Sequence, residues 1–182
     1  MRLPSVLTTD DLPLPELRAA LLDGELFALD AAFTPIDEVE SPRHRARAAH
    51  AGLPHRLIAE QHTAAWIWGA APPPSRHEFC VAIAARARVS GDGAHAVREV
   101  VIEPAEIVLF DGLQVTAPLR TVVDLARFSA EFGQREEQAA RTLMLHHRFG
   151  LDDCLDEIEH RRNLPRKRRA IERLEGLRGL QP

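Results

Sequence analysis

The chain has 182 residues, of which 45% are hydrophobic and 27% charged, and its formal net charge is −4. This composition is typical of one globular domain of ordinary size, with or without a small appendage. No apolar run approaches the roughly 20 residues of a membrane span, and the N-terminus lacks the features of a secretion signal. We therefore expect a cytoplasmic protein without membrane contact.

The small net charge conceals two poles of opposite sign. Residues 1–42 hold nine acidic residues against Arg2 and Arg18, whereas the segment from His160 onward is rich in arginine and contains Lys167, the only lysine. This asymmetry favours partners of opposite charge at the two ends. The acidic residues are Asp10, Asp11, Glu16, Asp23, Glu25, Asp30, Asp37, Glu38 and Glu40.

The first 42 residues predict one clear helix and one hairpin. Pro15 is suited to the start of a helix that Gly24 ends. The following segment, ELFALDAAFTP, alternates in polarity and predicts a small hairpin. These elements form a small N-terminal module.

Two helices are expected next. Residues 43–52 predict a helix ended by Gly52, and residues 55–70 predict a second helix, which the prolines at 72–74 break. The apolar anchors of the second helix are Leu57, Ile58, Trp66 and Ile67.

The middle of the chain predicts strands. Residues 78–84 and 96–102 are short apolar or alternating segments, separated by a Gly-Asp-Gly turn at 91–93. Residues 106–110 and 113–116, joined by Asp-Gly, predict a hairpin.

The last third predicts helices. Thr116 is a plausible N-cap with Pro118 in the first turn, and residues 134–150, 151–162 and 165–179 follow as three further helices. Together these elements predict an α+β fold: a small N-terminal module, a core of helices and a short antiparallel sheet, and a helical C-terminal half. The helix after Pro118 is amphipathic, with apolar residues Leu119, Val122, Val123 and Ala126.

That same helix carries a polar stripe. Arg120 and Asp124 are spaced i, i+4 and Arg127 follows, which predicts a chain of ion pairs, each exposed pair worth about 0.3–0.5 kcal/mol. A carboxylate between two arginines has a lowered pKa and is a poor proton carrier near neutral pH. We therefore interpret the stripe as structural rather than catalytic.

No arrangement of residues indicates a metal site or a catalytic centre. The nine histidines show no HExxH-like spacing. A metal-dependent nuclease needs two or three carboxylates with a lysine; Glu103 and Glu106 flank the hairpin, but no Glu-x-Lys occurs. Phosphate-binding glycine loops and a serine-hydrolase elbow are also missing. We expect no metal, no cofactor and no enzymatic activity.

Two basic stretches are candidates for binding nucleic acid or an acidic protein. One is RRNLPRKRRAIER near the C-terminus, and the other is RHRARAAH, in which Arg43 and Arg47 share a helix face. Clustered Lys and Arg are the footprint of phosphate binding, but no aromatic residue is interleaved for base stacking. The alternative is a solvated helix face. The candidates are Arg161, Arg162, Arg166, Lys167, Arg168 and Arg169, with Arg43, Arg45 and Arg47 assisting.

Three segments together resemble the AbiEi-family antitoxins, over most of residues 8–130. LTTDDL…ELRAALLDGELFALDAAFTP resembles the family's N-terminal winged helix-turn-helix. EQHTAAWIWGA resembles its Ser-His-x-Ala-Ala-x-x-x-Gly helix, with His62, Ala64, Ala65 and Gly69 in matching positions. EIVLFDGLQVTAPLRTVVDLAR resembles its GLPVTSPARTLLDLAR signature, which includes Thr116, Pro118, Arg120, Asp124 and Arg127.

The resemblance implies a bacterial, non-enzymatic antitoxin and transcriptional regulator of a type IV toxin–antitoxin operon. In such proteins a winged helix binds operator DNA, and the C-terminal region counters a nucleotidyltransferase-like toxin. The resemblance also implies two domains: a winged-helix-like module over residues 1–42 and an AbiEi-like α+β domain over residues 43–182.

The N-terminal module departs from the family pattern. The segment DLPLPEL leaves little room for a normal helix-turn-helix, and Leu29, Asp30 and Ala31 stand where a wing would carry basic residues. Phosphates repel such an acidic surface. One alternative is therefore a degenerate winged helix that has lost DNA binding. Its acidic surface would then contact a basic protein or screen the chain's own basic tail. A less favoured alternative is a relative of metal-dependent nucleases.

Overall fold

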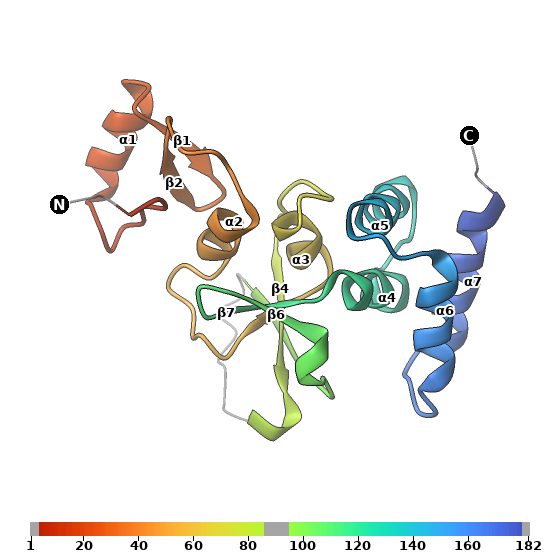
Figure 1. Cartoon of the computed structure of the whole chain (residues 1–182). Coiled ribbons are helices and arrows are strands. Elements are labelled where there is room, and N and C mark those ends of the chain that lie inside the picture. The colour runs from red at the N-terminus through yellow and green to blue at the C-terminus, as the bar shows by residue number, and fades with distance from the viewer. Residues whose placement is uncertain (1–3, 86–94, 180–182) are drawn as a thin grey trace.

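The computed structural model describes residues 4–85 and 95–179 and has an α+β fold, as expected (Figure 1). No helix in these residues is long and apolar enough to cross a bilayer. The predicted turn at 91–93 lies outside the described residues. The elements are α1 (Leu14–Leu22), β1 (Leu26–Leu29), β2 (Ala32–Pro35), α2 (Pro42–Ala49), β3 (Ile58–Ala59), α3 (Gln61–Ile67), β4 (His77–Ala82), β5 (His95–Val100), β6 (Ile107–Phe110), β7 (Leu113–Thr116), α4 (Pro118–Phe128), α5 (Gln134–His147), α6 (Leu151–His160) and α7 (Lys167–Gly176), with 3-10 helices η1 (Ile83–Ala85), η2 (Pro104–Glu106) and η3 (Leu177–Gly179).

The sheets explain how the chain is organised. β1 and β2 form a separate hairpin, and the larger sheet has the order β5-β4-β3-β7-β6. The pairs β3–β4 and β6–β7 are antiparallel, whereas β3–β7 and β4–β5 are parallel. The sheet is thus mixed where the sequence indicated an antiparallel one. Turn residues reveal the direction of a hairpin partner, but not of partners that are distant in the chain.

The helix predicted over residues 55–70 is shorter than expected, because its first part is strand β3. Ile58 pairs with Cys80 on one side and Gln114 on the other. Gln61, at the start of α3, has a φ of +49°, which turns the chain from strand to helix. A short apolar run fits either a buried strand or a buried helix, and here the two neighbouring strands satisfy its backbone groups.

Thr116 is not the N-cap of α4. It is the last residue of β7, its carbonyl accepts a hydrogen bond from Trp68 Nε1, and its Oγ1 lies 2.8 Å from Thr121 Oγ1. Ala117 occupies the cap position without a side-chain cap, and Pro118 begins the helix as predicted. The strand pairing of Thr116 with Ile107 therefore overrides its capping preference.

The fold has two large hydrophobic cores, and Trp68 packs against both of them. The first lies between the sheet and α2 and α3, and includes Trp66, Phe79 and Val115. The second joins α4 to α5, α6 and α7, and includes Val122 and Ile158. Figure 1 shows α4 between the sheet and the C-terminal helices, so this helix must be held in register with both sides.

The N-terminal module has a small core of its own around Leu7, Leu17 and Leu26. Its hairpin turn reaches the larger sheet, where Asp30 Oδ2 lies 2.8 Å from His77 Nε2. Burial would raise the pKa of the Asp30 carboxyl, but the hydrogen bond and charge of His77 outweigh it and lower that pKa. The N-terminal module and the helices α6 and α7 lie on opposite sides of the structure (Figure 1), and within the described residues no ion pair joins the module to the basic tail.

Substitution of two glycines by alanine tests the backbone conformations described above. Gly69, just after α3, has a φ of +81°, and a Cβ there would lie 3.0 Å from Arg45 Nη2. We expect Gly69→Ala to lower the free energy of unfolding by about 1–2 kcal/mol, because an L-residue is strained in the left-handed region. Urea unfolding measures this change.

The matched control is Gly176→Ala. Gly176 lies in α7, and a Cβ there would meet no atom within 4 Å. We expect this substitution to raise the free energy of unfolding by about 0.4–1 kcal/mol, because alanine favours the helix. Equal effects of the two substitutions would contradict the assigned backbone conformations.

Candidate functional site

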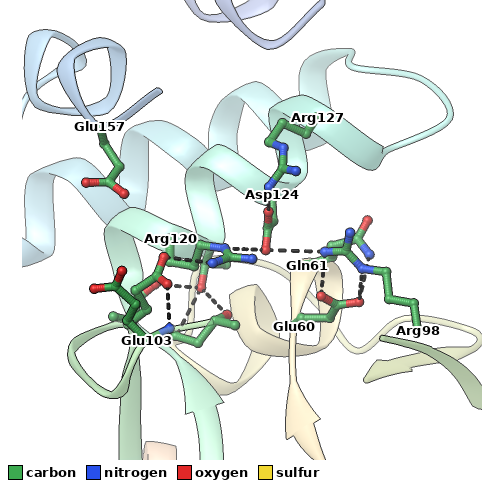
Figure 2. Close-up of polar contacts among 12 residues, drawn as sticks. Glu60, Gln61, Arg98, Glu103, Arg120, Asp124, Arg127 and Glu157 are labelled. Atoms are coloured by element: carbon green, nitrogen blue, oxygen red, sulfur yellow. Dashed lines mark hydrogen bonds and ion pairs between the residues drawn. The ribbon is translucent and has the colours of Figure 1, made fainter. Parts of the chain in front are cut away.

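The most concentrated group of charged side chains lies around Asp124, which is 0% exposed. Arg120 Nε donates to its Oδ2 at 2.7 Å and Arg127 Nη1 to its Oδ1 at 2.8 Å. Arg98 Nη2, from β5, lies 3.3 Å from Oδ2. The ion pairs expected along α4 are therefore present, but they are buried, and a third arginine from the sheet joins them (Figure 2).

The contacts extend from Asp124 in two directions. Glu60, which follows β3 and is 1% exposed, accepts two hydrogen bonds from Arg98, at 2.5 and 2.6 Å. On the other side Glu106 Oε1 accepts from Arg120 at 2.7 Å and from Arg161 at 2.6 Å. We call this set the Asp124 network; its members are Glu60, Arg98, Glu106, Arg120, Asp124, Arg127 and Arg161.

Burial shifts the titration of several members. It raises the pKa of the Glu60 carboxyl, whereas the bidentate Arg98 guanidinium favours the ionised form. For Arg98 burial acts to lower the pKa, but the hydrogen bonds and charge of Glu60 raise it. Burial lowers the pKa of Arg127 to about 10, and the nearby Arg120 and Arg98 guanidiniums act in the same direction.

The geometry favours a structural role for the carboxylates. Both oxygens of Glu60 and both of Asp124 already accept guanidinium N–H groups. In the described part of the chain no group of three or more His, Cys, Asp or Glu side chains is placed to hold a metal ion. Buried ion pairs are stable only when every partner is present, so the network holds α4 against β3, β5, η2 and the end of α6.

Sequence reasoning identified the stripe on α4 but missed its partners. Glu60, Arg98 and Glu106 lie in three separate segments, and no spacing rule connects them to Asp124. The available signal was weak: Glu60 directly follows the apolar Leu-Ile-Ala run, and Arg98 interrupts an alternating strand.

His62 joins three elements. Its Nδ1 lies 2.9 Å from Glu78 Oε2 on β4, and its Nε2 lies 3.0 Å from Glu136 Oε1 on α5. The hydrogen bond to Glu78, together with the one to Glu136, raises the pKa of His62 despite its burial. His62 thus connects α3 to the sheet and to α5.

Half of the predicted tail cations are engaged within the fold. Arg161 belongs to the Asp124 network and also contacts Glu157. Lys167 Nζ donates to the backbone carbonyls of Glu159 and Arg161 at the end of α6. Arg169 donates to the carbonyl of Ala130, just after α4, at 2.7 Å.

The other three tail cations are exposed. Arg162 and Arg168 make no hydrogen bond or ion pair with residues that the structure describes, and the Arg166 guanidinium lies 5.3 Å from the Phe128 ring centroid. These three residues retain charge that is available to a partner.

The second basic stretch is also divided. Arg45 Nε donates to the carbonyl of Ile67 at the end of α3, so it has a structural role. Arg43 and Arg47 are exposed on one face of α2, as expected, and lie 3.9 and 3.6 Å from Asp111. Their charge is therefore partly compensated.

Comparison with known proteins shows the family of the chain. The family model of the AbiEi antitoxin C-terminal domain matches residues 57–177, which include the whole Asp124 network. The chain therefore belongs to the AbiEi antitoxin family. Among solved structures it is similar to the RV2827C protein from Mycobacterium tuberculosis, at 15% identity, over 96% of this chain and 75% of that chain, with a TM-score of 0.39. No curated protein matches the chain.

Removal of the central carboxylate tests the network. We expect Asp124→Asn to lower the free energy of unfolding by about 3–5 kcal/mol, because three guanidiniums then face a neutral amide. The control is Asp152→Asn, which breaks a pair with Arg178 at an exposed position and should change stability by less than about 1 kcal/mol. Similar values in urea unfolding for the two variants would contradict the central role of Asp124.

The His62 contacts predict a pH dependence. Because the folded pKa of His62 is raised above 6.5, the stabilisation from its charged form is complete below that pH and disappears as the pH rises through the folded pKa. The pKa of Glu136 is lowered, so its contribution is lost only below about pH 4.5. His62→Gln should therefore destabilise the protein more at about pH 5.5 than at about pH 8.5, by on the order of 1 kcal/mol. A pH-independent difference in urea unfolding would contradict this assignment.

Proposed function

We propose that this protein is a non-enzymatic antitoxin that acts by binding, with its AbiEi-type domain over residues 43–182 countering a nucleotidyltransferase-like toxin. The observation that carries the proposal is the Asp124 network within the matched domain. The side chains best suited to chemistry are committed to holding helices and strands together, which leaves the surface to provide the function.

We further propose that the C-terminal end, rather than the N-terminal wing, makes any contact with operator DNA. The exposed Arg162, Arg166 and Arg168 support this choice, since phosphate contacts are made by Lys and Arg. The hairpin turn of residues 1–42 opposes it, because Asp30 at that turn is acidic and is paired with His77.

The pairing of Asp30 with His77 favours a second candidate function: a protein-interaction module that has lost DNA binding. The N-terminal module is acidic, and the turn of its β1–β2 hairpin contacts the larger sheet. Little cationic surface is left there to bind phosphates. In that case the module would meet a basic protein, and the exposed tail arginines would have no operator to contact.

DNA binding is tested by fluorescence anisotropy on the chain's own promoter at several salt concentrations. Replacement of Arg162, Arg166 and Arg168 by Gln should weaken binding at least about tenfold and reduce the log–log salt slope by about 0.9 for each phosphate that is no longer neutralised. The control replaces Arg18, Arg56 and Arg76, which changes the charge equally outside the tail. Equal effects of the two triple variants would contradict a specific role of the tail.

Toxin binding is tested by coexpression with a nucleotidyltransferase-like neighbour of the gene. We expect the two proteins to copurify and growth inhibition by the toxin to be relieved. Copurification without promoter binding would favour the protein-interaction module. Promoter binding without copurification would contradict toxin binding and leave only a transcriptional regulator. Metal-dependent cleavage of the duplex would overturn the non-enzymatic proposal.

A further inference from the structure

A large cavity lies next to the Asp124 network, and neither toxin nor operator binding explains it. Its volume is about 670 Å³, and it lies between β5, the end of α4 and the connection from α6 to α7. Pockets for small ligands have volumes of roughly 300–1,000 Å³. We call it the Phe128 cavity, after the residue at its α4 side.

The walls of the Phe128 cavity combine cationic and apolar groups. Four arginines line it: Arg98, Arg120, Arg127 and Arg161. Apolar side chains from all three sides complete the lining, among them Val100, Phe128 and Leu164. The Arg98 guanidinium lies 3.6 Å from the Phe128 ring centroid, so charge and apolar surface are adjacent rather than separated.

The arginines are held rigidly, but they keep unused donors. Arg127 uses Nε on the carbonyl of Pro165 and Nη1 on Asp124. Arg120 uses Nε and Nη1 on Asp124 and Glu106. Within the described residues Nη2 of both arginines has no hydrogen-bond partner, and neither atom is among the fully buried side-chain atoms that lack one. These N–H groups therefore belong to side chains that are held in fixed positions in the wall of the cavity.

Among the described residues that line the cavity, those on α4 are Arg120, Arg127 and Phe128, and none of them is acidic. The carboxylate of Asp124 is shared by three guanidiniums, and among residues 4–85 and 95–179 it is the only carboxylate that pairs with Arg127. Burial is the main cause of the lowered pKa of Arg127, and the charges of Arg120 and Arg98 act in the same direction. Glu99 and Glu103 line the cavity on the β5 side, where they disfavour an anion. An anionic group therefore fits best beside Arg127.

We propose that the Phe128 cavity binds a small amphipathic anion, whose carboxylate, sulfonate or phosphate group contacts Arg127 while its apolar body packs on Phe128 and Leu164. Arginine presents a planar pair of donors that matches such groups. Because the network already fixes the guanidiniums, binding requires little ordering of side chains. The inference is independent of toxin and DNA binding.

The test is a fluorescence titration of the whole chain with anilinonaphthalene sulfonate, beside its neutral analogue N-phenylnaphthylamine. We expect saturable binding of one sulfonate probe per chain, at least about tenfold tighter than the neutral probe, since a desolvated charge contact is worth about 1.4 kcal/mol or more. Non-saturable binding, or equal affinity for both probes, would overturn the proposal.

Variants locate the site. Arg127→Gln should abolish the preference for the anionic probe, but it also disturbs the Asp124 network. A second pair of variants is therefore made at Asn163, which is exposed and lines the cavity. At low salt Asn163→Glu should weaken sulfonate binding at least about threefold through charge repulsion, while Asn163→Gln leaves it unchanged. Unaltered sulfonate affinity in Asn163→Glu, or equal weakening of the neutral probe, would place binding elsewhere and overturn the assignment.

Discussion

The structure depends on one buried carboxylate, Asp124, and on the three guanidiniums that contact it. Charges taken out of water are tolerated only as a complete set, so the network forces β3, β5, η2, α4 and the end of α6 into one arrangement. It ties the sheet to α4, whose apolar residues belong to the helical core.

The residues of the Asp124 network stabilise the fold, and we assign binding to other parts of the chain. The family signature around α4 contributes cohesion, and His62 adds a second tie between the sheet and α5. In the proposals made above, binding falls to other parts of the chain: the exposed tail arginines, the acidic N-terminal module and the Phe128 cavity. The guanidiniums of Arg120 and Arg127, which Asp124 and Glu106 hold in place, also line the Phe128 cavity.

Several elements followed from local patterns. The hairpin of β6 and β7 was visible from Asp-Gly between two alternating runs, and Gly112 there has a φ of +86°. The helices α5, α6 and α7 were visible from their periodicity and their breakers. Strand β3 was wrongly included in a helix, since two residues carry no period, and Thr116 was wrongly assigned as a cap, because strand pairing with Ile107 outweighed its local preference.

The sequence by itself determined the α+β class, the family signature and the polar stripe of Arg120, Asp124 and Arg127, because spacing along one helix is a local property. Only the tertiary structure decided that the stripe is buried, that Glu60 and Arg98 complete it, and that Arg161, Lys167 and Arg169 are engaged in internal contacts. The physical reason is that burial and the pairing of charges depend on which distant segments the fold brings together, and no spacing within one segment encodes that.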